Sequence, residues 1–150
     1  MSKKENVQVE KVVTTEVAIK ELTEFLKKHK AKEFRRGKMT REVIEEDYID
    51  VIEAIEDGHL VFDGTKPKYT LRDPLFKDAE DKSLIVNEVN FRSRIKEADR
   101  ALVMDGLNLE KQRGTYVLKT LSYITQLSMV EIKKLEKEDF DVLNQICSVF

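Results

Sequence analysis

Apolar residues recur every three or four positions along most of this 150-residue chain, but between residues 59 and 91 they gather in short β-prone runs. The first pattern is typical of amphipathic helices and the second of strands. Asp63-Gly64, inside the second region, is a signal for a hairpin turn. The sequence therefore predicts an α+β fold that is predominantly helical and contains a small antiparallel β-sheet.

The ends of the predicted elements follow from capping and turn residues. Thr40 and Ser128 are expected to cap helices, Ser128 in a capping box with Glu131, and Gly58 is expected to end a helix. Asp73-Pro74 is expected to close the return strand of the hairpin. The predicted elements are a helix at 40–57, a hairpin at 59–72, a strand at 83–91 and helices at 94–105, 108–127, 129–135 and 137–150.

The predicted helix at 108–127 also carries an apolar stripe. Asn108 is its expected N-cap, and Gly114 inside it should destabilise it by about 1 kcal/mol relative to Ala. Its predicted buried face comprises Val117, Leu118, Leu121, Ile124 and Leu127.

Charge is unevenly distributed and indicates a boundary near residue 40. Residues 1–40 carry 11 basic and 6 acidic side chains, whereas residues 41–63 carry 1 basic and 9 acidic ones. We therefore expect residues 1–38 to form an arm, with an amphipathic helix from Thr15 to about Lys30 and a linker, and residues 39–150 to form a single domain. The net charge of −2 argues against a nucleic-acid binder that acts through bulk charge.

Composition favours a cytoplasmic protein. No apolar run approaches the ~20 residues of a membrane span, and no apolar stretch follows the polar N-terminus, so neither a membrane anchor nor a secretory signal is predicted. The single Cys147 fits a reducing compartment.

Residue types that carry catalysis are sparse, and no enzymatic activity, cofactor or metal is predicted. His29 lies in a basic stretch and His59 follows a turn, so both are expected to be structural or exposed. Cys147 lies on the apolar stripe of the last helix, where a thiol acts as a small hydrophobe. No nucleophile–base pair or phosphate-binding glycine pattern is present.

The sequence contains two groups of charged residues that could form binding sites. The acidic residues between Glu45 and Asp57 could hold a divalent cation, but their helical spacing favours a solvated polar face. The basic group Arg92, Arg94, Lys96 and Arg100 lacks interleaved exposed aromatics, so nucleic-acid binding is not expected there.

The last helix carries the candidate binding residues. Leu143, Ile146 and Phe150 share one face of it. That face either packs on the core or remains available to a partner helix or to a second copy of the chain, in the helix-in-groove mode of recognition. We take Leu143, Ile146 and Phe150 as the candidate partner-binding residues.

Several short segments over residues 69–150 resemble a known family in their order and residue class. They are Tyr69-Thr70-Leu71-Arg72-Asp73-Pro74, Phe91-Arg92-Ser93-Arg94-Ile95, Ile124-Thr125-Gln126-Leu127-Ser128, Ile132-Lys133-Lys134-Leu135 and Glu138-Asp139-Phe140, followed by a closing apolar helix. This series resembles the tail assembly chaperones of long-tailed bacteriophages and prophages.

The resemblance implies a non-enzymatic role in virion assembly in the host bacterial cytoplasm. Such chaperones bind the tape-measure protein, a very long helical protein, keep it soluble, and assist assembly of tail-tube subunits around it. Two alternatives remain: a structural virion protein of the tail tube or connector, and a small phage regulatory or nucleic-acid-binding protein that uses the basic N-terminal arm.

Overall fold

The computed structural model describes residues 12–76, 84–92 and 96–150. Within these residues the chain forms eight helices and a three-stranded antiparallel sheet, which confirms the predicted α+β, predominantly helical class. The elements in chain order are α1 (Thr15–His29), α2 (Ala31–Arg35), α3 (Arg41–Asp47), α4 (Ile49–Glu56), β1 (Leu60–Asp63), β2 (Lys66–Phe76), β3 (Leu84–Asn90), α5 (Glu97–Met104), α6 (Arg113–Thr125), α7 (Met129–Lys134) and α8 (Lys137–Cys147).

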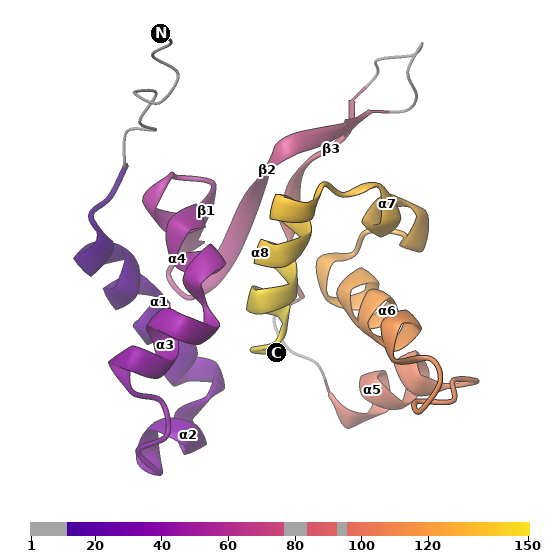
Figure 1. Cartoon of the computed structure of the whole chain (residues 1–150), viewed down its shortest axis with the longest axis horizontal. Coiled ribbons are helices and arrows are strands. Elements are labelled where there is room, and N and C mark those ends of the chain that lie inside the picture. The colour runs from indigo at the N-terminus through magenta and orange to yellow at the C-terminus, as the bar shows by residue number, and fades with distance from the viewer. Residues whose placement is uncertain (1–11, 77–83, 93–95) are drawn as a thin grey trace, which may run out of the picture.

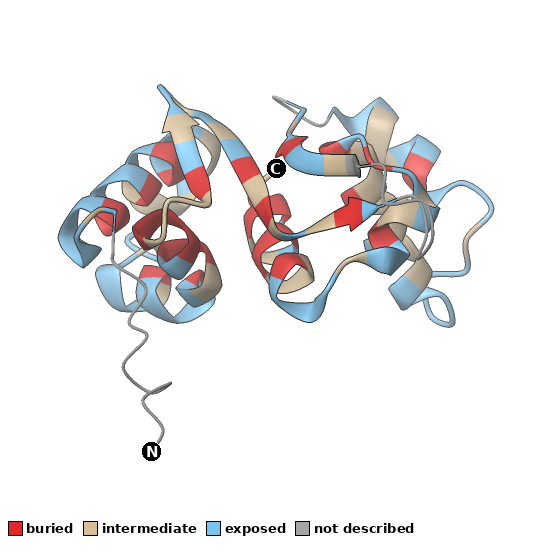
Figure 2. Ribbon diagram, turned by 90° about the horizontal axis from the view of Figure 1, so that it is seen from above, coloured by how far each residue is buried: buried red, intermediate tan, exposed pale blue. Residues whose placement is uncertain are grey.

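Helix α8 lies at the centre of the molecule. It contacts α4 on one side, α6 on the other and β2 behind it (Figure 1). Leu143 and Ile146 on α8 have no exposed surface. Figure 2 shows the buried residues gathered where the helices and the sheet meet, while the outer faces of the helices are exposed. One core therefore spans the described chain, and α8 joins its two halves.

The N-terminal helix belongs to this core. Thr14, one residue before the predicted helix start at Thr15, accepts a hydrogen bond from the amide of Val17 (3.3 Å) and caps α1. The buried face of α1, which includes Leu22 and Phe25, packs against α4 and lies in the same apolar cluster as α8. Helix α1 is therefore part of the same apolar core as residues 39–150. The short helix α2 lies where the linker was expected.

The predicted helix at 40–57 is wrong in one respect, because it divides into α3 and α4 at Tyr48, whose φ is −124°. The side chain of Gln145 on α8 accepts hydrogen bonds from the amides of Asp50 (3.0 Å) and Val51 (3.3 Å) and so caps the first turn of α4. A cap supplied by a residue so distant in sequence leaves no local signal. The predicted cap at Thr40 is confirmed.

The sheet has the order β1-β2-β3, with antiparallel neighbours. Asp63 pairs with Lys66 across a two-residue turn, in which Gly64 has φ +66°. The predicted end of the return strand at Asp73-Pro74 is wrong, because β2 continues to Phe76. The register shifts between Thr70 and Leu75, and this irregularity accommodates a proline that has no amide to donate.

The C-terminal helices match the predicted order but are shorter. The capping box at Ser128 is confirmed, since Ser128 Oγ accepts from the Glu131 amide (3.1 Å) and Glu131 Oε1 accepts from the Ser128 amide (2.8 Å). The predicted helix start at Asn108 is wrong: its side chain accepts from the Glu110 amide in a turn, and α6 begins at Arg113. Residues 94 and 95, at the start of the helix predicted at 94–105, lie outside the described residues.

None of the helices in the described ranges combines the length and the apolarity needed to span a bilayer.

Candidate partner-binding groove

A buried carboxylate fixes α8 to the sheet. Asp139, in the first turn of α8, has no exposed surface. Its oxygens accept hydrogen bonds from Tyr69 Oη (2.6 Å), the Arg72 amide (2.9 Å) and the Asp73 amide (3.0 Å). Burial and the hydrogen bond to Asp139 raise the pKa of Tyr69 above its ordinary value. The amides of Arg72 and Asp73 lie where the β2–β3 register shifts, and they donate to Asp139 on α8.

A second set of contacts fixes the end of α6 to the end of β3. The amide of Arg92 donates to the carbonyl of Ile124 (2.8 Å), and Arg92 Nε donates to the carbonyl of Tyr123 (2.7 Å). The Arg92 guanidinium also lies 4.3 Å from the centre of the Tyr123 ring. Thr125 Oγ1 donates to the carbonyl of Leu121 (2.6 Å), and the chain then turns at Gln126, whose φ is +64°.

These two anchors hold α6 and α8 side by side and leave a groove between them. One part, about 240 Å³, is lined by Tyr116, Val117, Thr120, Leu121, Asn144, Cys147 and Ser148. A second hollow, about 370 Å³, shares Tyr116 and Val117 with the first and is otherwise lined by Leu109, Glu110 and Arg113, on α6 and the segment before it. We call these two adjoining hollows together the α6–α8 groove. Most of its accessible wall is apolar, and its charged lining residues, Glu110 and Arg113, lie in the second hollow.

Two of the side chains that line this groove are large, apolar and exposed. Val117 is 36 % exposed and Leu109 is 41 % exposed, and Leu102 and Met104 on the neighbouring α5 are also exposed. Helices α5 and α6 contact each other. A group of exposed apolar side chains next to a groove is a common mark of a protein–protein contact surface.

The residues predicted to bind a partner lie elsewhere. Leu143 and Ile146 are wholly buried in the core, so in this structure neither side chain is available to a partner. Phe150 is half-buried, and its ring centre lies 5.8 Å from that of Phe25 and 6.1 Å from that of Phe91. The stripe on α8 is therefore used to join the two halves of the core, which is the other interpretation that the sequence allowed.

The sequence does not indicate the groove residues on α6, because the apolar spacing places Val117 on the predicted buried face. Within the predicted stripe, Val117 is exposed at the N-terminal half of α6. Leu121, Ile124 and Leu127 are buried as predicted. Adjacent apolar residues at 116–118, more than one narrow stripe requires, are the signal that could have indicated a second surface.

The cysteine and the two histidines, which are the residue types that could carry catalysis, make structural contacts. Cys147 is buried as predicted, and burial raises the pKa of its thiol. His29 lies against the rings of Phe25 and Phe150, and His59 Nδ1 lies 2.8 Å from the carbonyl oxygen of Thr70. Across the described residues, no group of three or more His, Cys, Asp or Glu side chains has a metal-binding arrangement.

Three of the acidic residues predicted to form a solvated face, Asp50, Glu53 and Asp57, line part of a cavity of about 220 Å³. Acidic side chains of α4 and α8 surround it, together with Arg72, which pairs with Asp57 at 2.8 Å. The basic group around residues 92–100 is divided between several contacts: Arg100 donates to the carbonyl of Phe150 (3.1 Å), and Arg94 lies outside the described ranges.

No protein-family model, curated protein or solved structure matches the chain. The resemblance to phage tail assembly chaperones therefore stands on the motifs themselves. In the structure those motifs hold the anchors of α6 and α8: Asp139 bonds Arg72 and Asp73, and Arg92 bonds the end of α6.

Proposed function

We propose that the protein is a non-enzymatic assembly chaperone that covers an apolar stripe on a long helical partner. Following the motif resemblance, we propose the tape-measure protein of a phage tail as that partner, in the bacterial cytoplasm, with tail-tube subunits as a second partner. The observation that carries the proposal is the α6–α8 groove, an open apolar surface beside exposed hydrophobic side chains.

The groove has dimensions that suit one face of a helix. Helix α6 has 13 residues, and a helix of that length extends about 20 Å. A partner helix laid along it would present three or four apolar side chains at i, i+3, i+4 and i+7, in the mode by which amphipathic helices fill hydrophobic grooves. Val117 and Leu109 would contact that stripe, and Glu110 and Arg113 would meet polar residues at its edge.

The size of the groove favours reversible binding. A surface of one helix face falls at the small end of specific interfaces, where complexes are transient. Many copies bound along one long partner would keep its apolar stripes from aggregating, and each copy could still leave when tube subunits arrive. Charged residues make up 37 % of the chain, which would help such a complex remain in solution.

Val117→Asp tests the proposal, because it places a charge in the groove at a position where unfolding is not expected. Val130→Asp on α7, where the side chain is 63 % exposed, is the matched control outside the groove. Each variant is co-expressed with the tape-measure protein, and co-purification and thermal unfolding are measured. We expect Val117→Asp to lower co-purification at least tenfold with little change in melting temperature, and Val130→Asp to leave both unchanged.

Equal co-purification of both variants would contradict the proposal. So would the presence of the protein in purified, mature virions at stoichiometric amounts, because that result would assign it a structural role.

A further inference from the structure

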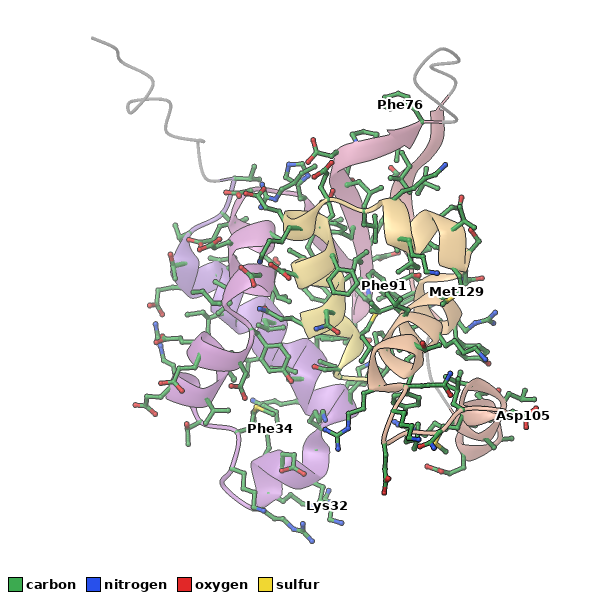
Figure 3. All side chains as sticks on the ribbon, turned by 45° about the vertical axis from the view of Figure 1, so that its right-hand side comes forward. Lys32, Phe34, Phe76, Phe91, Asp105 and Met129 are labelled. Atoms are coloured by element: carbon green, nitrogen blue, oxygen red, sulfur yellow. The ribbon has the colours of Figure 1, made fainter. Side chains whose placement is uncertain are left out.

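A cationic cavity lies where the end of α1, the β1–β2 turn and the residues that follow β3 meet. Its volume is about 270 Å³, and its lining includes Lys28, Lys66 and Arg92 but no acidic residue. Phe91 also lines it, and Figure 3 shows Phe91 at the opposite end of the sheet from Phe76. The cationic cavity shares no lining residue with the α6–α8 groove, so its role does not depend on the partner proposed above.

The two lysines of the cationic cavity have no acidic partner among the described residues. Glu24 lies one turn before Lys28 on α1, in the favourable order for an ion pair within a helix, yet Lys28 Nζ donates instead to Thr65 Oγ1 in the β1–β2 turn (3.0 Å). Asp63 pairs with Lys66 in the hairpin, but it neither lines the cavity nor forms an ion pair with Lys66. The amines in the cavity are therefore available to an anion.

Arg92 is held in place by contacts with α6. Its Nε donates to the carbonyl of Tyr123 (2.7 Å), and its guanidinium lies 4.3 Å from the centre of the Tyr123 ring. The two terminal amino groups of this guanidinium form no hydrogen bond or ion pair with the part of the chain that the structure describes. The third cation of the cavity is thus positioned through one nitrogen and keeps donors for a ligand.

Aromatic rings line another part of the cationic cavity. The rings of Phe91 and Phe150 lie nearly parallel, at 9°, with 6.1 Å between their centres, and both side chains are half-buried. The Phe150 ring also lies against His29, at 5.1 Å, and against Phe25, at 5.8 Å. These contacts fix the rings, and a ring that is fixed and partly accessible offers apolar surface to a planar group at little cost in conformational entropy.

The combination of cations, a hydroxyl and aromatic rings matches an organic phosphate. A phosphate monoester carries about −1.5 to −2 charges at pH 7 and three strong acceptor oxygens, which suits three cationic side chains and the hydroxyl of Thr65. The volume of about 270 Å³ is just below the roughly 300–1,000 Å³ that is typical of small-molecule sites. The ligand is therefore small, with one phosphoryl group and one planar group.

We propose that the cationic cavity binds a small phosphate monoester that carries a planar ring. The phosphoryl group lies among Lys28, Lys66 and Arg92, and the ring lies against Phe91 and Phe150. Nucleoside monophosphates and aryl phosphates share this chemistry. A nucleic-acid strand fits less well, because it needs basic side chains along a path of several phosphates, whereas these cations gather in one small cavity of a chain with a net charge of −2.

The test is the binding of three probes to the isolated full-length chain, measured by titration calorimetry at low ionic strength. The probes are inorganic phosphate, phenyl phosphate and adenosine monophosphate. We expect phenyl phosphate to bind with a dissociation constant below about 1 mM. It should bind about tenfold more tightly than inorganic phosphate, because ring contacts add to the charge-assisted hydrogen bonds. Tighter binding of adenosine monophosphate than of phenyl phosphate identifies a nucleotide as the ligand, and the reverse order identifies an aryl phosphate.

A cavity variant and a matched control separate this site from general surface charge. Lys28→Ala/Lys66→Ala should weaken phenyl phosphate binding about tenfold or more, because it removes two of the three cations. Both side chains are exposed, so thermal unfolding without ligand should be unchanged. Lys20→Ala/Lys133→Ala removes the same charge from exposed positions outside the cavity and should bind phenyl phosphate as the wild type does.

Amide chemical shifts in NMR spectra give a second measurement that needs no variant. Titration with phenyl phosphate should move the amide signals of Thr65, Lys66 and Arg92 and leave that of Val117, in the α6–α8 groove, unchanged. The proposal is overturned if neither ester binds at millimolar concentration, or if inorganic phosphate binds as tightly as both esters. It is also overturned if the control variant loses as much affinity as the cavity variant.

Nucleic acid is the remaining alternative for the cationic cavity. A DNA oligonucleotide that binds more tightly than either ester, and whose binding the cavity variant abolishes, would overturn the proposal by assigning the cavity to a strand. None of these results affects the test of the α6–α8 groove, because that test measures co-purification of variants with no change in the cationic cavity.

Discussion

Asp139→Ala should destabilise the protein strongly, because it removes the acceptor that joins α8 to β2. Three donors lose their partner: Tyr69 Oη at 2.6 Å and the amides of Arg72 and Asp73 at 2.9 and 3.0 Å. An unsatisfied buried donor costs about 1–3 kcal/mol. Tyr69 is wholly buried, but Arg72 and Asp73 are partly accessible to water, which can replace part of the loss. We therefore expect a decrease of about 3–5 kcal/mol in the free energy of unfolding.

Urea denaturation followed by circular dichroism measures this change. With a slope of about 2 kcal/mol/M, the midpoint should fall by about 2 M. Asp139→Asn retains one acceptor oxygen but turns an amide group towards backbone donors. Its decrease in the free energy of unfolding should therefore be smaller than that of Asp139→Ala. Asp141→Asn, two residues further along the helix, is the matched control: its bond to Lys137 is exposed, and its loss should stay below about 0.5 kcal/mol.

A double-mutant cycle with Tyr69→Phe isolates the side-chain bond, whose coupling should be about 1.5–3 kcal/mol because one partner is charged. If Asp139→Ala and Asp141→Asn destabilise the protein equally, Asp139 does not join the helix to the sheet.

Two further predictions concern the same interior. The pKa values of Tyr69 and Tyr48 are raised mainly by burial, so the folded state holds their protons more tightly than the unfolded state, where tyrosine ionises near pH 10. These two tyrosines should leave stability unaffected below about pH 10 and should lower it above that pH. A Tyr69→Phe variant should therefore show a shallower fall in urea midpoint between pH 9 and 11 than the wild type. An equally steep fall would contradict a raised pKa at Tyr69. Gln145→Ala removes the cap of α4 and should cost about 1 kcal/mol, with faster hydrogen exchange at the amides of Asp50 and Val51. Unchanged exchange at both amides would show that Gln145 does not cap α4.

The elements that sequence patterns predicted are those set by neighbours in the chain. Ser128 and Glu131 cap each other within one turn, and Thr40 caps α3 in the same local way. Gly58 has the left-handed backbone, φ +82°, that ends a helix. The class of the fold followed from the spacing of apolar residues, which is also a local property.

The features that were not predicted depend on residues far apart in sequence. Gln145 on α8 caps the first turn of α4, and Asp139 on α8 accepts hydrogen bonds from the amides of Arg72 and Asp73 in β2. The candidate groove was missed for a related reason, since periodicity shows which residues are apolar but not which of two apolar faces remains uncovered. Helix α8 packs against α4, α6 and β2 together, and that use of its stripe could not be read from α8 alone.

Hydrogen–deuterium exchange of the free protein and of its complex with the tape-measure protein tests the α6–α8 groove most directly. We predict that binding slows exchange at residues 113–121 and 144–148, on the two sides of the groove, and leaves the β1–β2 hairpin unchanged. Slower exchange confined to the hairpin or to α1, with none along α6, would contradict the account.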